Sequence, residues 1–211
     1  MRLLHCLWLD PMSIAFGPSP SLPIVIVTKR HADNRGWLSE TFHDKRLRDL
    51  GIICTFVQEN QSRSSRRGTL RGFHFQTPPA AQAKLIGILH GRILDVTVDI
   101  RRGSSTFGKY VSVELSSDNG KQLYIPAGFA HGFVTLEDEV SVLYKVSDYY
   151  APSHEGGIRW NDPDIAFPWP FKTADIIRSE RDDRLPLLND LESPFPYEGC
   201  PLTELPVLNL N

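Results

Sequence analysis

The sequence has few cysteines, little net charge and no long apolar run. Cys6, Cys54 and Cys200 lie far apart without a paired spacing, which is typical of a protein in a reducing compartment. A formal net charge of −2 gives no reason to expect a nucleic-acid partner. No segment approaches the roughly 18 apolar residues that a membrane span requires, and His5 interrupts the apolar start, so a signal peptide is not predicted. We therefore expect a cytoplasmic protein with no membrane or nucleic-acid partner.

The chain length of 211 residues favours one domain, because it is sufficient to bury one sizeable core. We predict a poorly specified N-terminal arm over residues 1–22, with Met12 as an alternative start. The main domain is predicted over residues 23–188, and residues 189–211 read as a Pro-rich C-terminal tail.

Short apolar and β-branched runs recur with turn residues between them, as in an all-β sandwich or barrel. The predicted strands cover residues 24–28, 37–43, 53–61, 70–76, 84–90, 92–100, 109–115, 121–125, 132–136 and 140–147. The turn SSDNG at 116–120 predicts a hairpin, because Asn-Gly tolerates positive φ angles. Helical patterns are short and cover residues 44–50 and 174–184.

One predicted strand, RILDVTVDI, carries aspartates whose direction the pattern leaves open. Leu94, Val96 and Val98 share one face, and Asp95 and Asp99 lie on the other. The aspartates either face solvent or line a polar interior, as small barrels and jelly rolls often have.

Two segments resemble the signatures of the cupin superfamily, whose fold is a double-sheet jelly roll. GKQLYIPAGFAHGF fits the second signature, with Gly120 at its start and His131 at its histidine position. Gly68 and His74 fit the first signature up to its first histidine. We therefore expect an all-β, cupin-type double-sheet jelly roll with short peripheral helices.

The metal ligands of the first cupin signature are incomplete in this chain. Gln76 replaces the second histidine, and Lys84 stands where the signature has glutamate. A divalent metal prefers neutral imidazoles and carboxylates, and an ammonium group in its first shell would repel it. We therefore expect no metal and no other cofactor.

Longer motifs make the resemblance more specific. LRGFHFQ, QAKLIGILHGRILDVTVDIRRGSSTFGKY, QLYIPAGFAHGF, LYKVSDYYAPSHEGGIRWNDP and SERDDRLPLL are similar to segments of the dTDP-4-dehydrorhamnose 3,5-epimerase family. They occur in that family's order over about residues 24–188. The resemblance implies a homodimeric isomerase. Its implied substrate is a dTDP-linked 4-keto-6-deoxy sugar, inverted at carbons 3 and 5 in rhamnose-type deoxysugar biosynthesis.

The resemblance also implies four catalytic residues. Removing a proton beside a ketone requires a base on one face, an acid on the other and positive charge near the ketone oxygen. His74 matches the family base and Asp182 its carboxylate partner, although Asp183 is one position away and leaves the register open. Lys84 matches the lysine near the ketone, and Tyr144 matches the proton-donating tyrosine.

Further matched positions are implied to contact the substrate: Arg35, Glu40, Gln58, Asn60, Arg71, His131 and Tyr150. The first two lie on an arm that is expected to cross to the other subunit. Arg71 is suited to phosphate because its planar fork can make two parallel hydrogen bonds, and Tyr150 is expected to stack on thymine. Since Arg71 and His74 would point to opposite faces of a regular strand, we expect Gly72 to allow a β-bulge that turns both inward.

Other functions remain compatible with these residues. One is a single-centre 3- or 5-epimerase acting on another nucleotide-linked keto sugar, and another is a ketoisomerase. A sugar-nucleotide-binding cupin without catalysis is less well supported, because binding alone does not require opposed proton-transfer groups. Individually, His74 and Tyr144 could be packing residues, and Lys84 could be solvated.

Overall fold

The computed structural model describes residues 20–210. Residues 1–19, which include most of the predicted N-terminal arm and Met12, lie outside the described residues, as does residue 211. The strands are β1 (Ile24–Thr28), β2 (Arg30–Asp33), β3 (Gly36–Ser39), β4 (Gln58–Ser64), β5 (Leu70–Gln76), β6 (Lys84–His90), β7 (Arg92–Asp99), β8 (Tyr110–Ser116), β9 (Lys121–Ile125), β10 (Phe129–Thr135), β11 (Val140–Val146), β12 (Glu155–Gly157) and β13 (Val207–Leu210). The α-helices are α1 (Asp44–Asp49) and α2 (Glu180–Arg184).

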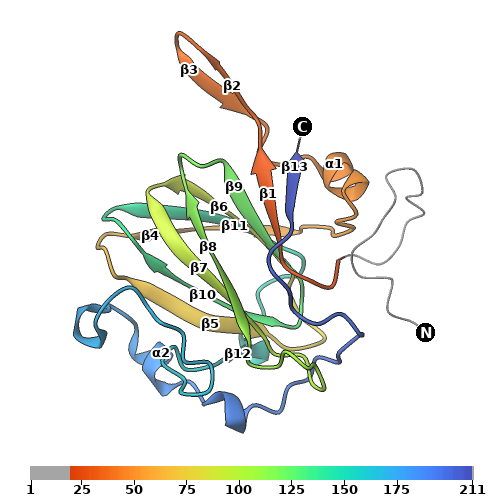
Figure 1. Ribbon diagram of the computed structural model, residues 1–211, viewed down its shortest axis with the longest axis vertical. Helices are drawn as coiled ribbons and strands as arrows, with labels where there is room; N and C mark the ends of the chain where they lie inside the picture. The colour runs from red at the N-terminus through yellow and green to blue at the C-terminus, as the bar shows by residue number, and fades with distance from the viewer. Residues whose placement is uncertain (1–19, 211) are drawn as a thin grey trace.

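Two large sheets face each other, and a two-stranded hairpin, β2–β3, projects from one end of the sandwich (Figure 1). The six-stranded sheet has the order β13-β1-β9-β6-β11-β4, and the five-stranded sheet has the order β12-β5-β10-β7-β8. The all-β double-sheet architecture predicted from the sequence is therefore confirmed.

The main hydrophobic core lies between the two sheets. Ile86 and Leu123 from the six-stranded sheet pack with Ile93 of β7, and all three are almost fully buried. Asp95 and Asp99 share the β7 face of Ile93 and are 0% exposed. The alternative in which these aspartates face solvent is therefore wrong, and the polar-interior alternative is correct.

The outer face of each sheet is covered by a different part of the chain. Leu47 of α1 packs over the six-stranded sheet. The chain after β12 covers the five-stranded sheet, where Ile158 and Ile165 contact Phe73 and Val96. The same covering segment leads to α2, which contacts β5 and thus lies next to the first cupin-like motif.

Asp162 shows how the covering segment is folded. Its carboxylate accepts hydrogen bonds from the backbone N–H groups of Asp164, Ile165 and Leu188, and its side chain is buried. This residue organises a turn, as expected for an aspartate in the sequence WNDP.

Three predicted strands are displaced in the structure. The predicted strand 37–43 is shortened to β3, which pairs with β2 rather than joining a sheet. The predicted strand 53–61 begins only at β4, because Phe56 turns away to pack against Phe42. The predicted strand 132–136 starts earlier, at β10, because the preceding residues pair with β7.

The helix predicted over residues 174–184 is also interrupted. A 3₁₀ turn occupies residues 173–175, and α2 begins only at Glu180. Between them, Ile176 is buried in a hydrophobic cluster and Ile177 forms a parallel bridge with Thr69. Burial and pairing of this segment hold it extended, which separates the two helical pieces.

The C-terminal segment contributes a strand that the sequence pattern did not indicate. β13 runs parallel to β1, with Val25 opposite Val207 and Thr28 opposite Leu210.

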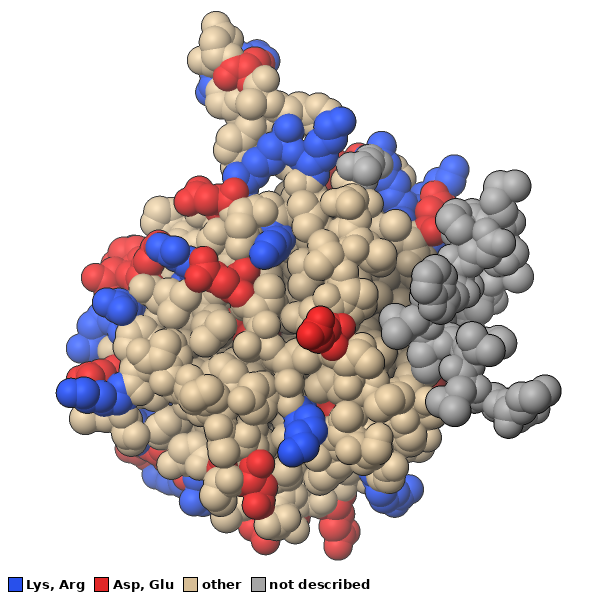
Figure 2. Space-filling view, viewed as in Figure 1, with Lys and Arg blue, Asp and Glu red and all other residues tan. Residues whose placement is uncertain are grey.

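On the face of the molecule shown in Figure 2, basic and acidic side chains are interspersed. Among residues 20–210, no helix is long and apolar enough to cross a lipid bilayer.

Candidate active site

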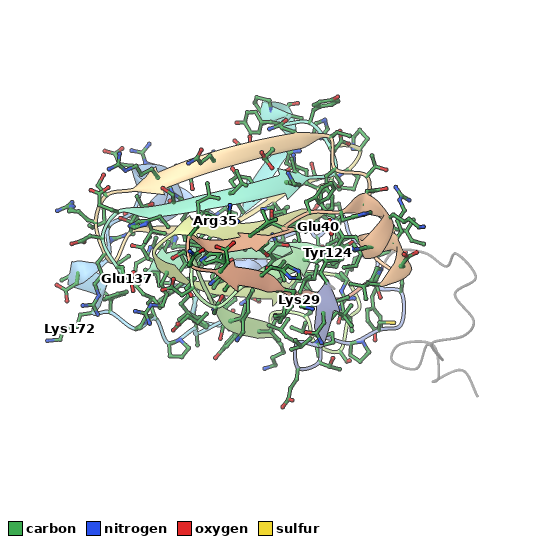
Figure 3. All side chains as sticks on the ribbon, turned by 90° about the horizontal axis from the view of Figure 1, so that it is seen from above. Lys29, Arg35, Glu40, Tyr124, Glu137 and Lys172 are labelled. Atoms are coloured by element: carbon green, nitrogen blue, oxygen red, sulfur yellow. The ribbon has the colours of Figure 1, made fainter. Side chains whose placement is uncertain are left out.

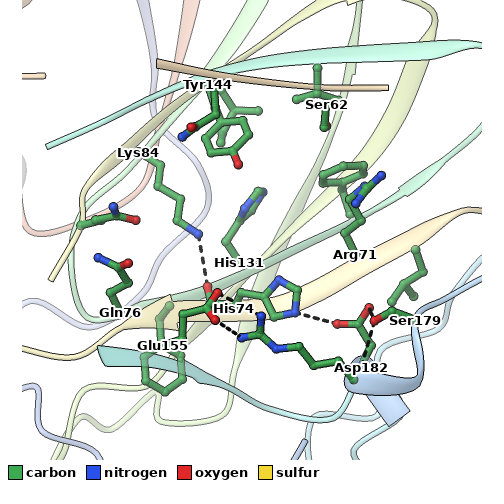
Figure 4. A pocket seen from close by; sticks show the side chains of 18 of the residues that line it. Ser62, Arg71, His74, Gln76, Lys84, His131, Tyr144, Glu155, Ser179 and Asp182 are labelled. Atoms are coloured by element: carbon green, nitrogen blue, oxygen red, sulfur yellow. Dashed lines mark hydrogen bonds and ion pairs between the residues drawn. The ribbon is translucent and has the colours of Figure 1, made fainter. Parts of the chain in front are cut away.

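A cavity of about 640 Å³ opens between the two sheets and is bordered by α2. This volume lies within the range of roughly 300–1,000 Å³ that is typical of small-molecule sites. The predicted site residues that line it are Gln58, Asn60, Arg71, His74, Lys84, His131, Tyr144, Tyr150 and Asp182. Side chains far apart in the sequence therefore meet here, as Figure 4 shows.

His74, on β5, is paired with a carboxylate from α2. Its Nε2 lies 2.6 Å from Oδ1 of Asp182, so the register in which Asp182 is the partner is the correct one. Asp183 is instead engaged by Arg178 and by the indole N–H of Trp160. In the tautomer that donates Nε2–H to the carboxylate, Nδ1 carries the lone pair.

The exposure of the pair suits proton transfer. The side chain of His74 is 35% exposed, whereas that of Asp182 is only 5% exposed. Burial raises the pKa of Asp182, but hydrogen bonds from His74 and Ser179 outweigh this effect and hold the pKa below its usual value. Asp182 is therefore an anion at neutral pH, and the imidazole is the member of the pair that a ligand can reach.

A β-bulge in β5 places His74 and Arg71 in the same cavity. His131 of β10 is opposite His74 and Phe133 is opposite Arg71, so β5 has one extra residue between these pairs. Gly72 occupies this point with φ 132°, and a Cβ atom there would lie only 2.4 Å from the Cα of Gly132. The predicted bulge is confirmed, and it requires glycine.

Lys84 and Tyr144 approach the cavity from the opposite, six-stranded sheet. The amino group of Lys84 donates a hydrogen bond of 3.2 Å to the backbone carbonyl of His74. Burial lowers the pKa of Lys84 to about 8, against the opposing effect of Asp95. Burial raises the pKa of Tyr144, partly offset by Arg71. At neutral pH the site therefore contains an ammonium group and a protonated phenol facing His74 (Figure 4).

His131 lines the cavity and is paired with a buried aspartate. Nε2 of His131 lies 2.8 Å from Oδ2 of Asp95, and both residues are buried. Burial lowers the pKa of His131, opposed by Asp95. A neutral His131 suits a hydrogen-bonding role toward a sugar rather than a cationic one.

The mouth of the cavity is organised by polar contacts from β4. Gln58 donates to Oδ1 of Asn60 at 2.9 Å and accepts from the backbone N–H of Tyr150 at 2.9 Å. The ring of Tyr150 is left half exposed beside the cavity. A flat aromatic group in this position is suited to stacking on a planar base.

Arg35 and Glu40 are not brought to this cavity within the chain. Arg35 pairs with Asp33 on the projecting hairpin, and its side chain is 85% exposed. Glu40 pairs with Arg46 of α1. Figure 3 looks onto the end of the sandwich from which the hairpin projects, where both residues are labelled. Their contact with substrate stays a prediction, and it would require a second subunit.

Gln76, which replaces the second cupin histidine, has a structural role. Its amide donates to the carbonyl groups of Ala80 and Tyr149 and accepts from the N–H of Ala151. The hydrogen bonds of Gln76 tie β5 to the loops around the cavity. Within residues 20–210, no three His, Cys, Asp or Glu side chains are grouped so that they could hold a metal ion.

Comparison with known proteins identifies the family. The model of the dTDP-4-dehydrorhamnose 3,5-epimerase family matches residues 23–190. The chain is 44% identical over 173 residues to the Sinorhizobium fredii dTDP-4-dehydrorhamnose 3,5-epimerase, covering 82% of this chain and 88% of that protein. The Escherichia coli protein of the same name is 46% identical over 169 residues, or 80% of this chain and 90% of its own. The chain belongs to this family.

Solved structures of dTDP-4-dehydrorhamnose 3,5-epimerases and related proteins share the fold. The Legionella pneumophila 3,5-epimerase in complex with dTDP-4-keto-L-rhamnose has a TM-score of 0.78 and 42% identity, covering 82% of this chain and 93% of its own. A 3'-monoepimerase from Streptomyces bikiniensis in complex with dTDP-quinovose has a TM-score of 0.73 and 34% identity, covering 79% and 84%. As a member of the 3,5-epimerase family, the chain is an isomerase-class enzyme.

Two site residues of this epimerase-family chain were not identified by sequence reasoning. Asp95 holds His131, but strand alternation alone left its direction open. Ser179 hydrogen-bonds to Asp182, and the spacing S-x-x-D at a helix start is a recognisable capping signal. The second residue could therefore have been found from the sequence.

Proposed function

We propose that this protein inverts carbons 3 and 5 of a dTDP-linked 4-keto-6-deoxy sugar, in rhamnose-type deoxysugar biosynthesis, with no metal or other cofactor. The observation that carries the proposal is the His74–Asp182 pair, which faces Tyr144 across the cavity with Lys84 beside it. A base on one sheet and an acid on the other can act on opposite faces of one sugar ring.

In the first step, Nδ1 of His74 removes the proton from a carbon next to the ketone. The electrons of the broken C–H bond form a C=C bond, and the ketone oxygen becomes an enolate oxygen. The ammonium group of Lys84 stabilises this negative charge, and the anion of Asp182 stabilises the imidazolium that forms. His131 hydrogen-bonds to the sugar from the cavity wall.

In the second step, the phenol of Tyr144 donates its proton to the same carbon from the opposite face. The enolate collapses to the ketone with the configuration inverted. Arg71, whose charge favours the ionised phenol, stabilises the tyrosinate until solvent returns a proton. Solvent also removes the proton from His74, so atoms and charge balance over the cycle.

The nucleotide is bound at the open end of the cavity. Arg71 binds phosphate, Gln58 and Asn60 hydrogen-bond the ligand, and Tyr150 stacks on thymine. We further propose a cytoplasmic homodimer in which the hairpin carries Arg35 and Glu40 to the partner subunit. Trp37 and Leu38 of the hairpin are exposed apolar residues, which supports a contact between the hairpin and a partner subunit.

Deuterium exchange tests the proposed reaction. After incubation with dTDP-4-keto-6-deoxyglucose in deuterated water, we expect label at both carbon 3 and carbon 5, because each proton lost is replaced from solvent. NMR and mass spectrometry of the sugar measure the incorporation. Label at only one carbon would favour a single-centre epimerase, and recovery of a 3-keto sugar would favour a ketoisomerase. A substrate that binds but takes up no label would favour a binding protein.

Replacing Tyr144 by phenylalanine separates exchange from inversion. His74 can still remove a proton and return a deuteron to the same face, whereas the opposite face has lost its acid. We expect the rate of inversion to fall by about 100-fold, while deuterium uptake falls much less. Comparison of the label with the stereochemistry of the recovered sugar measures the two rates.

The matched control is Tyr110→Phe, which removes a phenol from β8 outside the cavity. It should leave both rates unchanged. Equal loss of exchange and inversion in Tyr144→Phe would contradict the assignment of Tyr144 as the acid.

A further inference from the structure

Ser179 makes two hydrogen bonds with one residue of the proposed catalytic pair. It is the N-cap of α2, with extended backbone angles of φ −79° and ψ 154°. Its Oγ accepts a hydrogen bond from the backbone N–H of Asp182 at 3.2 Å. The same hydroxyl donates its proton to Oδ2 of Asp182 at 2.7 Å. Ser179 therefore contacts both the main chain and the carboxylate of Asp182.

The two oxygens of the Asp182 carboxylate have different partners. Oδ2 is held by Ser179, and Oδ1 is held by His74 at 2.6 Å. Figure 4 shows the resulting chain of dashed contacts from Ser179 through Asp182 to His74. Asp182 is 3% exposed, so water cannot readily replace a lost partner of Oδ2. The orientation of the carboxylate is therefore set from both sides.

We infer that Ser179 is a positioning residue, whose hydroxyl fixes the Asp182 carboxylate in the plane from which it orients the imidazole of His74. This inference rests on the proposed function. The terminal torsion of an aspartate is broad, so a single contact with His74 does not fix the carboxylate plane. Without the hydroxyl, Oδ2 is a buried acceptor with no donor, and such groups are costly. The carboxylate then turns toward other donors, and the imidazole loses its fixed tautomer and direction.

Helix capping alone is a separate role that can be tested independently. As a cap, Ser179 accepts the hydrogen bond from the N–H of Asp182, and glycine at an N-cap costs little helix stability even without this acceptor. Ser179→Gly therefore removes the donor to Oδ2 while largely preserving the start of α2. Ser179→Thr keeps both the cap and the donor. A purely structural role predicts that the two variants behave alike once folded.

The experiment compares both variants with Glu180→Gln, which perturbs the exposed ion pair between Glu180 and Arg184 on the same helix without contacting Asp182. We expect Ser179→Gly to lower kcat for deuterium exchange by about ten-fold with little change in KM. Ser179→Thr should restore most of the rate, and Glu180→Gln should match the wild type.

A spectroscopic measurement that does not depend on turnover completes the test. In ¹⁵N-histidine-labelled protein, the His74 Nε2–H proton that is donated to Asp182 is followed by ¹H NMR, with assignment by its absence in His74→Ala. We expect this resonance to shift or broaden in Ser179→Gly and to return in Ser179→Thr.

The possible failures can be distinguished. If the wild type takes up no deuterium, the proposed function fails. If the wild type exchanges, and Ser179→Gly is folded with an unchanged kcat and an unchanged His74 resonance, the role of Ser179 is overturned. A loss in Ser179→Gly that threonine does not rescue also overturns it, provided that circular dichroism shows both variants folded.

Discussion

Replacement of His74 by alanine is expected to lower deuterium uptake at both carbon 3 and carbon 5 by about 10²–10⁴-fold, the usual contribution of a general base. Both carbons flank the same ketone. The side chain of His74 is 35% exposed beside its buried carboxylate partner, whereas His131, which is also paired with an aspartate, is itself buried. A single base serving both positions predicts that the two rates fall together. Measurement of incorporation at each carbon by NMR tests this expectation.

Binding should be largely preserved in the same variant. The proposed nucleotide contacts come from Arg71 and from residues at the open end of the cavity rather than from the imidazole. The Kd for dTDP, measured by calorimetry, should therefore remain within about three-fold of the wild-type value, a difference of about 0.7 kcal/mol or less in binding free energy. His90→Ala removes an exposed histidine at the end of β6 and should change neither quantity. Exchange by His74→Ala at close to the wild-type rate would show that another group is the base.

Local patterns predicted most of the strands because alternation and turn residues act over a few residues. The strands β1, β5, β6 and β9 have the bounds that were predicted from the sequence. β13 was missed because its pairing with β1 joins opposite ends of the chain, and residues 207–210 carry no strong alternation. The helix expected over residues 174–184 was wrong because tertiary burial of Ile176 overrides local helical preference.

Site residues could be predicted where they lie in a recognisable sequence motif, but not where their role depends on contacts between distant segments of the chain. His74, Lys84 and Tyr144 sit in long family-like segments, and all three line the cavity. Asp95 lies in an alternating strand whose two faces are both buried, so parity could not reveal its contact with His131. Arg35 pairs with Asp33 on the projecting hairpin, so its proposed contact with substrate would require a second subunit.

Replacement of Lys84 by methionine is expected to lower kcat/KM for exchange by about 10²–10³-fold, as for loss of one preorganised donor to a developing oxyanion. The ammonium group lies in the cavity beside the backbone of His74, where it can meet the enolate oxygen. Methionine has a similar length and no charge, so the cavity shape is largely kept. The matched control is Lys145→Met, which removes from β11 a lysine that is paired with Glu59 of β4. This variant should retain activity.

The pH dependence of activity follows from the charge of Lys84. Burial lowers its pKa to about 8, so the group is an ammonium below that pH and a neutral amine above it. The wild-type kcat/KM, which reports the free enzyme, should therefore fall as the pH rises through about 8. This limb of the profile should disappear in Lys84→Met. Lys84→Arg keeps its charge at all accessible pH values and should move the decline to higher pH.

The free energy of unfolding should also depend on pH through Lys84, but it should rise with pH where activity falls. The pKa of Lys84 is 10.5 without the fold and about 8 within it, so the unfolded chain binds more protons between these values. The contribution of Lys84 to the free energy of unfolding therefore rises with pH across this window. At pH 7 the fold carries the full cost of a buried ammonium, and Lys84→Met should be more stable than the wild type by urea titration. A less stable Lys84→Met with an unchanged pH profile would show that the amine serves packing rather than enolate stabilisation.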